Sequence, residues 1–381
     1  MSRDEIINWN MREYDEYLTQ KIDEPKVDNL VKPPLDPSNY DRANATLLVL
    51  ARNRELNKVI VTIQQIEDKF NNKYHYPYTF LNDAEFSQKF INGIKLLLPG
   101  RELYFEAIDP KIWKKPSTID KEKEREGILY LKEEKIGYSE MESYHNMCRF
   151  YSGNFYKHPR LLKFKWYWRF EPGTNYFCKI DYDLFKFMEM NNKTYGFTIS
   201  LYDAQQSIKT LWPTTLEFLS QNPQYLHPNG AFNWLTEDFM NKKKTTETGG
   251  YSTCHFWSNF EIGNMDFFRS EPYDNWFQYL DSKGGFYYER WGDAPVHSVG
   301  LGLFEDKSKI HWFRDIGYEH YPYYNCPNSD KCNTREPGPK SGKLGGPVCE
   351  VGKFSFPHLY DQNCVSNWVR YEMTDKELGL Y

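Results

Sequence analysis

The sequence predicts one elaborated α/β domain. An apolar run at 46–50 ends in polar residues, a helix-spaced stretch follows it, and a second short apolar run comes next. This strand, helix, strand order is how a parallel α/β unit begins. Length alone would fit two or three domain-sized units, but the alternation recurs along the chain, and 381 residues with 40% hydrophobic content can bury one large core.

The first third of the chain contains the clearest elements. The continuous apolar run from Thr46 to Leu50 predicts a buried strand that leads into a loop at Ala51-Arg52-Asn53. Apolar residues then recur at helical spacing, and further alternation follows. The expected elements are a helix at 56–70, a strand at 78–81, a helix at 86–98 and a strand at 103–107.

The middle of the chain continues the pattern after a charged excursion at 111–135. An aromatic strand at 165–170 runs directly into Glu171-Pro172-Gly173. A turn is required there, because Pro172 has no N–H and Gly173 tolerates positive φ. The other expected elements are helices at 138–156, 181–190 and 267–280, and strands at 194–201, 253–260 and 311–318.

The two ends of the chain differ in character from this core. Residues 1–42 are polar and carry four prolines, which predicts an extended arm, the remnant of a stem below a membrane anchor further upstream. Sequons at Asn44 and Asn192 agree with a secretory route. The tail at 326–381 predicts disulfide-tied loops with two disulfides among its own cysteines. Zinc is a competing explanation, but no second close pair follows the first two of them, which are Cys326, Cys332, Cys349 and Cys364.

Composition limits the partners. A net charge of -5 and a pI near 6.0 argue against a nucleic-acid surface, because phosphate affinity depends on clustered Lys and Arg. Aromatic residues make up 18% of the chain, and flat rings with polar edges suit stacking against sugars, although most serve packing. No run approaches the roughly 20 apolar residues of a membrane helix, and the first residues lack the apolar stretch of a signal peptide. The chain as given is expected to be soluble.

Four polar residues at the ends of predicted elements are candidates for chemistry. Glu261 lies among aromatic and amide residues at an expected strand end, just before a helix that Asn264 can cap. Glu171 is presented where the aromatic strand ends, as a metal-dependent nucleotide-sugar enzyme requires. Each candidate also has a purely structural explanation: a salt bridge for Glu261, turn formation for Glu171, helix capping for Asp293 and surface hydrogen bonding for His320.

Six long motifs in fixed order support the functional explanation. They are YHNMCRFYSG, WYWRFEPG, NKTYGFTISLYD, GGYSTCHFWSNFEIG, GGFYYERWGDAPVHSVGLGLFED and HWFRDIGYEHYPYYNCPN. Together they resemble the fungal α-1,2-mannosyltransferases of glycosyltransferase family 15, which are type II Golgi membrane proteins with a GT-A fold. The resemblance covers nearly the whole chain from about Ala43 onward.

The resemblance implies a GT-A domain over 43–381 with a Rossmann-like, mixed central sheet. Its nucleotide-binding part would span about 43–200, its acceptor and catalytic part about 201–325, and its C-terminal wrap 326–381. The implied reaction is the Mn²⁺-assisted, retaining transfer of mannose from GDP-mannose to the 2-hydroxyl of a mannoside or mannosylated glycoprotein in the Golgi lumen, on N-linked or O-linked chains.

Residue roles follow from the same resemblance, position by position. Glu261 resembles the catalytic carboxylate, and Asp293 a supporting or acceptor-side acid. Glu171 stands in for the acidic metal-site motif, whose last acid is replaced by Gly173, and His320 resembles a metal ligand. The residues that resemble contacts to the donor or the acceptor are Arg52, Tyr144 and Arg169.

The route of retention stays open at this point. Glu261 would either attack to form a mannosyl-enzyme or steady an oxocarbenium-like state while the acceptor enters on the face of the leaving group. Two other classes of protein also remain. A retaining glycoside hydrolase uses paired carboxylates beside aromatic walls, and a non-catalytic mannan-binding protein would use its rings for stacking alone.

Overall fold

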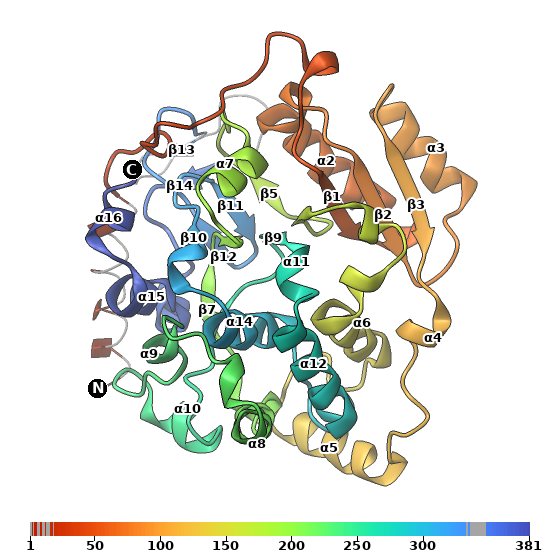
Figure 1. The fold of residues 1–381 in the computed structure, drawn as a ribbon, viewed down its shortest axis with the longest axis vertical. Coiled ribbons are helices and arrows are strands. Elements are labelled where there is room, and N and C mark those ends of the chain that lie inside the picture. Colours follow the sequence, from red (N-terminus) through yellow and green to blue (C-terminus); the bar gives the residue numbers. More distant parts are fainter. Residues whose placement is uncertain are drawn as a thin grey trace.

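The structure is a computed structural model that describes residues 19–332 and 348–381, with Thr334, Arg335 and residues 2, 4, 5, 8, 9, 12, 16 and 17. A seven-stranded sheet occupies the centre of the molecule (Figure 1). From one edge to the other, its strands are β10 (Ile310–Trp312), β6 (Tyr195–Phe197), β9 (Glu261–Asn264), β4 (Trp166–Arg169), β1 (Ala45–Leu50), β2 (Tyr78–Asn82) and β3 (Leu103–Ala107).

The sheet is mixed. Strands β4, β1, β2 and β3 are parallel neighbours, and β10 and β6 form a second parallel pair. Between these two groups, β9 runs antiparallel to both β4 and β6. Five of the six residues of β1 are buried, as expected for a central strand covered on both faces. The predicted α/β class with a mixed central sheet is confirmed.

Helices cover the sheet in two groups. On one side α2 packs against α3, and elsewhere α6, α12 and α14 pack together. All twelve residues of α14 are buried, which explains why its sequence is apolar on every side. The helices are α2 (Leu56–Lys69), α3 (Gln88–Leu97), α4 (Pro110–Trp113), α5 (Lys121–Glu133), α6 (Glu142–Gly153), α7 (Leu184–Met190), α8 (Leu211–Gln221), α9 (Phe232–Leu235), α10 (Lys242–Glu247), α11 (Met265–Phe268), α12 (Glu271–Lys283), α13 (Gly285–Tyr288), α14 (Asp293–Phe304), α15 (Val365–Glu372) and α16 (Asp375–Leu378).

Several predicted elements are divided in the structure. The strand expected at 194–201 is two strands, β6 and β7 (Ser200–Tyr202), and β7 pairs with β8 (Cys254–Phe256) outside the main sheet. The helix expected at 267–280 breaks between α11 and α12, because Pro272 suits the first turn of a new helix better than the interior of a long one. The strand expected at 311–318 separates into β10 and β11 (Tyr318–His320), and β11 belongs to a small sheet with β12 (Tyr323–Asn325) and β5 (Asn175–Tyr176).

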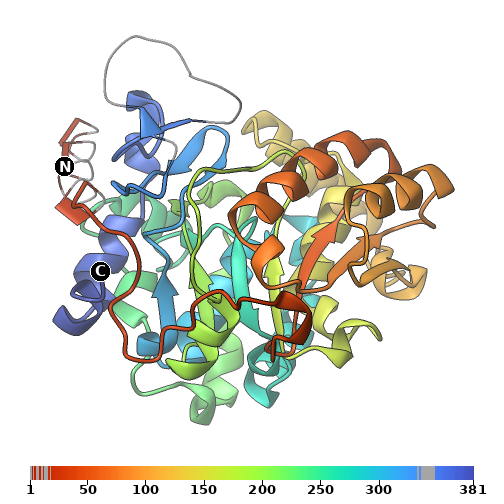
Figure 2. The same cartoon turned by 90° about the horizontal axis from the view of Figure 1, so that it is seen from above.

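The N-terminal arm lies along the domain. From residue 19 onward it runs beside α16 and then toward β1 (Figure 2). The backbone N–H of Lys26 donates to the carbonyl of Leu380, and Ile22 is 5% exposed. The arm therefore contributes little core of its own but is fixed to the far end of the chain. Among the residues that the structure describes, no helix is long and apolar enough to span a bilayer.

Three disulfides fix the tail. Cys326 pairs with Cys349 inside the tail, near the short pair of strands β13 (Thr334–Arg335) and β14 (Cys349–Glu350). The other two tail cysteines reach back into the domain in the pairs Cys178–Cys332 and Cys254–Cys364. The prediction of two disulfides within the tail is therefore wrong, because sequence spacing does not encode which cysteines meet in space.

Candidate active site

The candidate site lies where β4 and β6 end and β9 begins. Glu261 is the first residue of β9 and pairs with Arg169 on β4 and Phe197 on β6. The expectation that Glu261 follows a strand at 253–260 is wrong, because that strand stops at Phe256 and Glu261 opens a new one. Glu261 still reaches the expected edge, because the start of an antiparallel strand lies beside the carboxyl ends of its neighbours.

Arg169, the last residue of β4, connects the acids. Its side chain is 2% exposed and donates to Asp293 Oδ2 and, at 2.8 Å, to Glu171 Oε1. Its Nη1 also lies 3.7 Å from Glu261 Oε1. The guanidinium carbon lies 3.6 Å from the ring centroid of Tyr151, in cation–π geometry. One buried cation therefore joins three carboxylates from three different elements.

Glu261 has no exposed surface. Its Oε2 accepts a hydrogen bond from the Tyr195 hydroxyl at 2.8 Å and lies 2.9 Å from His297 Nδ1. Burial opposes a charge on the imidazole, but the neighbouring carboxylate outweighs it and raises the pKa of His297 above its ordinary value. A sugar reaches Glu261 only if neighbouring side chains move.

Asp293 is the first residue of α14, and Gly292 is the N-cap. Its Oδ2 accepts from the Ser258 hydroxyl at 2.8 Å in addition to Arg169. Burial would raise the pKa of Asp293, but the Arg169 guanidinium and these hydrogen bonds hold it below its ordinary value. A negative charge in this place is also favoured by the positive end of the helix dipole. Asp293 is therefore a buried anion at the site.

Glu171 and His320 form the part of the site that is open to solvent. Their side chains are 30% and 35% exposed, and His320 Nε2 lies 3.5 Å from Glu171 Oε2. Burial opposes ionisation of Glu171, but His320 and Arg169 lower its pKa to about 2. The turn that presents Glu171 contains Gly173 at φ +93°, as predicted from the Pro-Gly pair.

A carboxylate oxygen and an imidazole nitrogen at this separation suit a divalent cation such as Mn²⁺. No group of three or more His, Cys, Asp or Glu side chains that could hold a metal occurs in the described part of the chain. Phosphate oxygens or water would then have to complete the coordination of a cation at Glu171 and His320. The residues present therefore fit a metal that is held jointly by protein and substrate.

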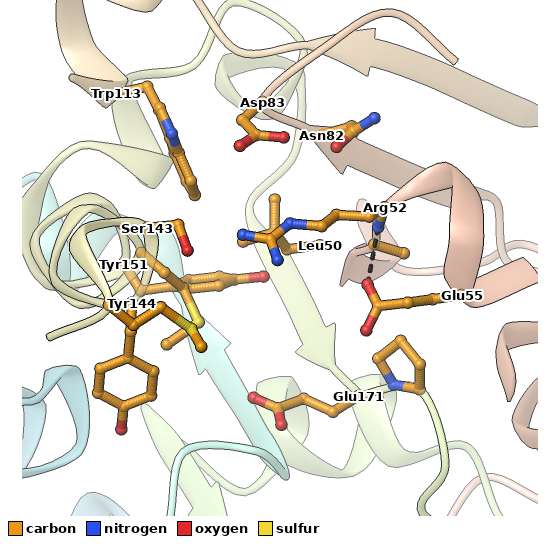
Figure 3. A pocket seen from close by; sticks show the side chains of 14 residues that line it. Leu50, Arg52, Glu55, Asn82, Asp83, Trp113, Ser143, Tyr144, Tyr151 and Glu171 are labelled. Atoms are coloured by element: carbon orange, nitrogen blue, oxygen red, sulfur yellow. Dashed lines mark hydrogen bonds between the residues drawn. The ribbon is translucent and has the colours of Figure 1, made fainter. Parts of the chain in front are cut away.

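A pocket extends from Glu171 across the carboxyl ends of β1 and β2. Arg52 and Tyr151 point toward one another across it (Figure 3). The hydroxyl of Tyr144, on α6, accepts a hydrogen bond from Arg290 at 3.2 Å. The pocket lining, from β1, β2, β4, α4, α6 and their loops, is Leu50, Ala51, Arg52, Glu55, Asn82, Asp83, Trp113, Met141, Ser143, Tyr144, Met147, Tyr151, Glu171 and Pro172.

Comparison with known proteins now identifies the family. Residues 4–373 match the family model described as glycolipid 2-alpha-mannosyltransferase. The chain is 50% identical over 383 residues to the probable mannosyltransferase KTR4 of Saccharomyces cerevisiae, and the match covers 99% of this chain and 79% of that protein. This chain belongs to the glycolipid 2-alpha-mannosyltransferase family. It is therefore a glycosyltransferase.

Solved structures of two family members agree. The X-ray structure of Ktr4p from S. cerevisiae in complex with GDP matches this mannosyltransferase with a TM-score of 0.92 and 50% identity, covering 100% of this chain and 94% of that one. Core-mannan synthase A from Aspergillus fumigatus, in its Mn/GDP form, matches with a TM-score of 0.85 and 45% identity, over 93% of each chain. The predicted family and fold are confirmed.

All seven residues that the family resemblance predicted lie in this one region. Arg169 joins Glu171, Glu261 and Asp293, and His320 contacts Glu171. Arg52 and Tyr144 line the pocket that Glu171 also lines. The structure therefore brings them together, although their individual roles stay predictions.

Sequence reasoning missed four residues of this region. His297 and Tyr195 contact Glu261, Ser258 contacts Asp293, and Asp83 lines the pocket. The spacing of Asp293 and His297, four apart on one helix, is a signal that could have identified His297. Asp83 comes two residues after the strand predicted at 78–81, just as Arg52 comes two residues after the apolar run at 46–50.

Proposed function

We propose that this enzyme transfers mannose from GDP-mannose to the 2-hydroxyl of a mannoside, with retention at the anomeric carbon and with the help of Mn²⁺. The observation that supports this most is the cluster in which Arg169 joins Glu171, Glu261 and Asp293 beside a pocket at the strand ends. The GDP found in one relative and the Mn/GDP form of another support the same donor and cation.

The pocket suits a nucleoside diphosphate that lies across the strand ends. Glu171 follows β4 and Asp83 follows β2, so they are separated by two strand spacings, about 10 Å. With the diphosphate at Glu171, the nucleoside extends past Arg52 toward Asp83. A carboxylate accepts hydrogen bonds only, and guanine offers two adjacent N–H donors on one edge. We therefore place the base at Asp83.

In this proposal the reacting sugar lies between the Glu171–His320 pair on one side and Glu261 on the other. Glu171 and His320 hold the cation, which would neutralise charge on the departing GDP. Arg169 orients Glu171 and Asp293, and Glu261 places a negative charge opposite the leaving group, where the sugar becomes positive. The full burial of Glu261 favours an electrostatic role over direct attack, so we propose acceptor entry on the face of the leaving group.

We also propose a cellular compartment for the enzyme and a role for each part of its domain. Three disulfides favour an oxidising compartment, in agreement with the Golgi lumen. Among the described residues, those that line the pocket all lie between 50 and 172, which supports a nucleotide-binding part at about 43–200. Glu261, Asp293 and His320 come from the proposed acceptor and catalytic part at about 201–325. The acceptor is a mannosylated glycan, N-linked or O-linked.

Product analysis tests the proposed reaction. Purified enzyme, GDP-mannose and methyl α-mannoside should yield GDP and an α-1,2-linked disaccharide, and chelation should abolish this. A retaining hydrolase would release mannose without an acceptor, and a mannan-binding protein would bind oligomannose without releasing GDP. Either result would contradict the proposal.

The metal assignment has its own matched pair of variants. His320→Ala should raise the Mn²⁺ concentration for half-maximal activity by about 10- to 100-fold. His227→Ala serves as the control, because His227 lies far from the acids of the site. Its backbone N–H donates to the carbonyl of Leu303, and Leu303 is about 15 Å from Asp293 along α14. An unchanged Mn²⁺ titration in His320→Ala would remove His320 from the metal site.

A further inference from the structure

The two oxygens of the Glu261 carboxylate have unequal surroundings. Oε2 accepts from Tyr195 and contacts His297 Nδ1 at 2.8 and 2.9 Å. Oε1 is buried and has no hydrogen-bond partner among the described residues, with Arg169 Nη1 3.7 Å away. A buried carboxylate oxygen without a donor is costly and calls for an explanation.

The second nitrogen of His297 restricts where its protons are. Nε2 lies 2.8 Å from the backbone carbonyl oxygen of Tyr151. A carbonyl oxygen only accepts, so Nε2 must carry hydrogen. In a neutral ring Nδ1 would then be an acceptor that faces the Glu261 carboxylate, which is also an acceptor. One further proton must therefore lie between Nδ1 and Oε2.

We infer that this proton resides on His297, so that a buried imidazolium holds Glu261 as a carboxylate with Oε1 free. His297 is thus a positioning residue for the transfer reaction, and this inference rests on the proposed role of Glu261. Tyr195 donates to the same Oε2, and hydrogen bonds to the charged form of a carboxylate favour that form. Asp293, one helical turn before His297, adds a second negative charge.

The remaining neighbours of His297 complete its surroundings. Arg169 Nη1 lies 3.7 Å from Glu261 Oε1, and Arg169 is already bonded to Asp293 and Glu171. In the described part of the chain, the other groups found against the imidazole ring carry no formal charge. They are Phe155 next to α6, Phe268 on α11, Tyr273 on α12 and the backbone of Tyr151 on α6.

The pair has a clear consequence for catalysis. A lone carboxylate in such an apolar place would take up a proton, and a neutral acid stabilises no positive charge on a sugar. With His297 protonated, Glu261 stays ionised. The pair then forms an oriented dipole whose negative end, Oε1, faces the Arg169 cluster. The Glu261–His297 pair should therefore add no pH dependence of its own to transfer near neutral pH, where competition between protons and the metal for His320 still can.

¹⁵N NMR of the histidine side chains detects directly whether His297 Nδ1 carries this proton. In ¹⁵N-histidine-labelled enzyme at pH 7, the histidine whose signal is lost in His297→Gln should show two N–H groups. Glu261→Gln should convert it to a ring with one N–H, because a side-chain amide can donate to Nδ1. Tyr195→Phe, which removes only a hydroxyl, should leave the imidazolium intact. A wild-type His297 with a single N–H at pH 7 would overturn the inference.

The pH profile of transfer provides the second readout. His297→Gln should lower kcat by about 10- to 100-fold, leave KM for GDP-mannose nearly unchanged and change the pH dependence of transfer, because the proton between Nδ1 and Oε2 loses the imidazole that holds it. His311→Gln is the control, because this buried histidine lies on β10, two strands from β9. A His297→Gln profile parallel to that of the wild type would contradict a positioning role.

The two proposals fail in distinguishable ways. An inactive wild-type enzyme with a doubly protonated His297 would contradict the proposed function but not the proton assignment. An active enzyme with a neutral His297 would contradict this inference alone.

Discussion

Replacement of Arg169 by methionine should strongly destabilise the fold. Arg169 is 2% exposed, and its partners Glu261 and Asp293 are 0% and 7% exposed at the side chain, so water does not replace the lost cation. Removal of one member of a buried ion pair costs about 3–5 kcal/mol because the remaining charge is left unpaired. The ion pair with Glu171 adds little to this cost, because the Glu171 side chain is 30% exposed and solvent can replace the lost cation. We expect the free energy of unfolding of Arg169→Met to fall by about 3–5 kcal/mol.

A double-mutant cycle shows whether the charge is the cause. Guanidinium unfolding with the disulfides intact would be followed by tryptophan fluorescence for the wild type, Arg169→Met, Asp293→Asn and the double variant. If Asp293 is the main unpaired charge, Asp293→Asn should cost less in the Arg169→Met background, with a coupling energy of about 1–3 kcal/mol. Additive costs, or an Arg169→Met variant within about 0.5 kcal/mol of the wild type, would refute the reasoning.

Three further predictions also concern stability. The double variant Cys254→Ser/Cys364→Ser should lose about 2–5 kcal/mol in denaturant unfolding, because a closure between residues 110 apart is removed. Burial raises the pKa of Asp315 to about 6, so the folded state binds this proton more tightly than the unfolded state does. The wild type should therefore lose up to about 3 kcal/mol of stability through this group as pH rises from 4 to 7, and Asp315→Asn should not show that loss. Gly263→Ala places a methyl carbon 2.7 Å from a ring carbon of Tyr167, its neighbour on β4, and should lower the free energy of unfolding by about 1–3 kcal/mol. Gly137→Ala is the control, because its methyl carbon would have nothing within 4 Å, and it should cost less than half of that.

The parallel half of the fold could be predicted from the sequence because its signals are local. The strand at 103–107 and the helix that starts at Leu56 occur at the expected positions, since apolar runs and helical spacing report burial directly. The turn at Gly173 was also predictable, because it depends on the chemistry of two adjacent residues.

Strand β9, which runs antiparallel to its neighbours β4 and β6, could not be predicted in the same way. Strand β9 has four residues and includes Gly263, so it has neither the length nor the apolar alternation of a recognisable strand. Its direction depends on neighbours that are distant in sequence. The same limit applies to Cys332 and Cys364, whose partners lie outside the tail.

The site shows the same contrast. Glu171 and Glu261 could be singled out because acids beside aromatic strands are unusual. His297 lies in a helix whose residues are all buried, so its four-residue spacing from Asp293 is the one local sign that separates it from a packed core residue. Its contact with Glu261 arises only in the folded chain, where α14 packs against β8 and α6.

The most direct test of the account is the rate of mannosyl transfer by Glu261→Gln, measured beside its affinity for GDP-mannose in the presence of Mn²⁺. The substitution removes the charge and retains the shape. The account predicts normal donor binding with a transfer rate lowered at least about 100-fold. Transfer near the wild-type rate with normal binding would show that the carboxylate does not stabilise the reacting sugar and would contradict the account.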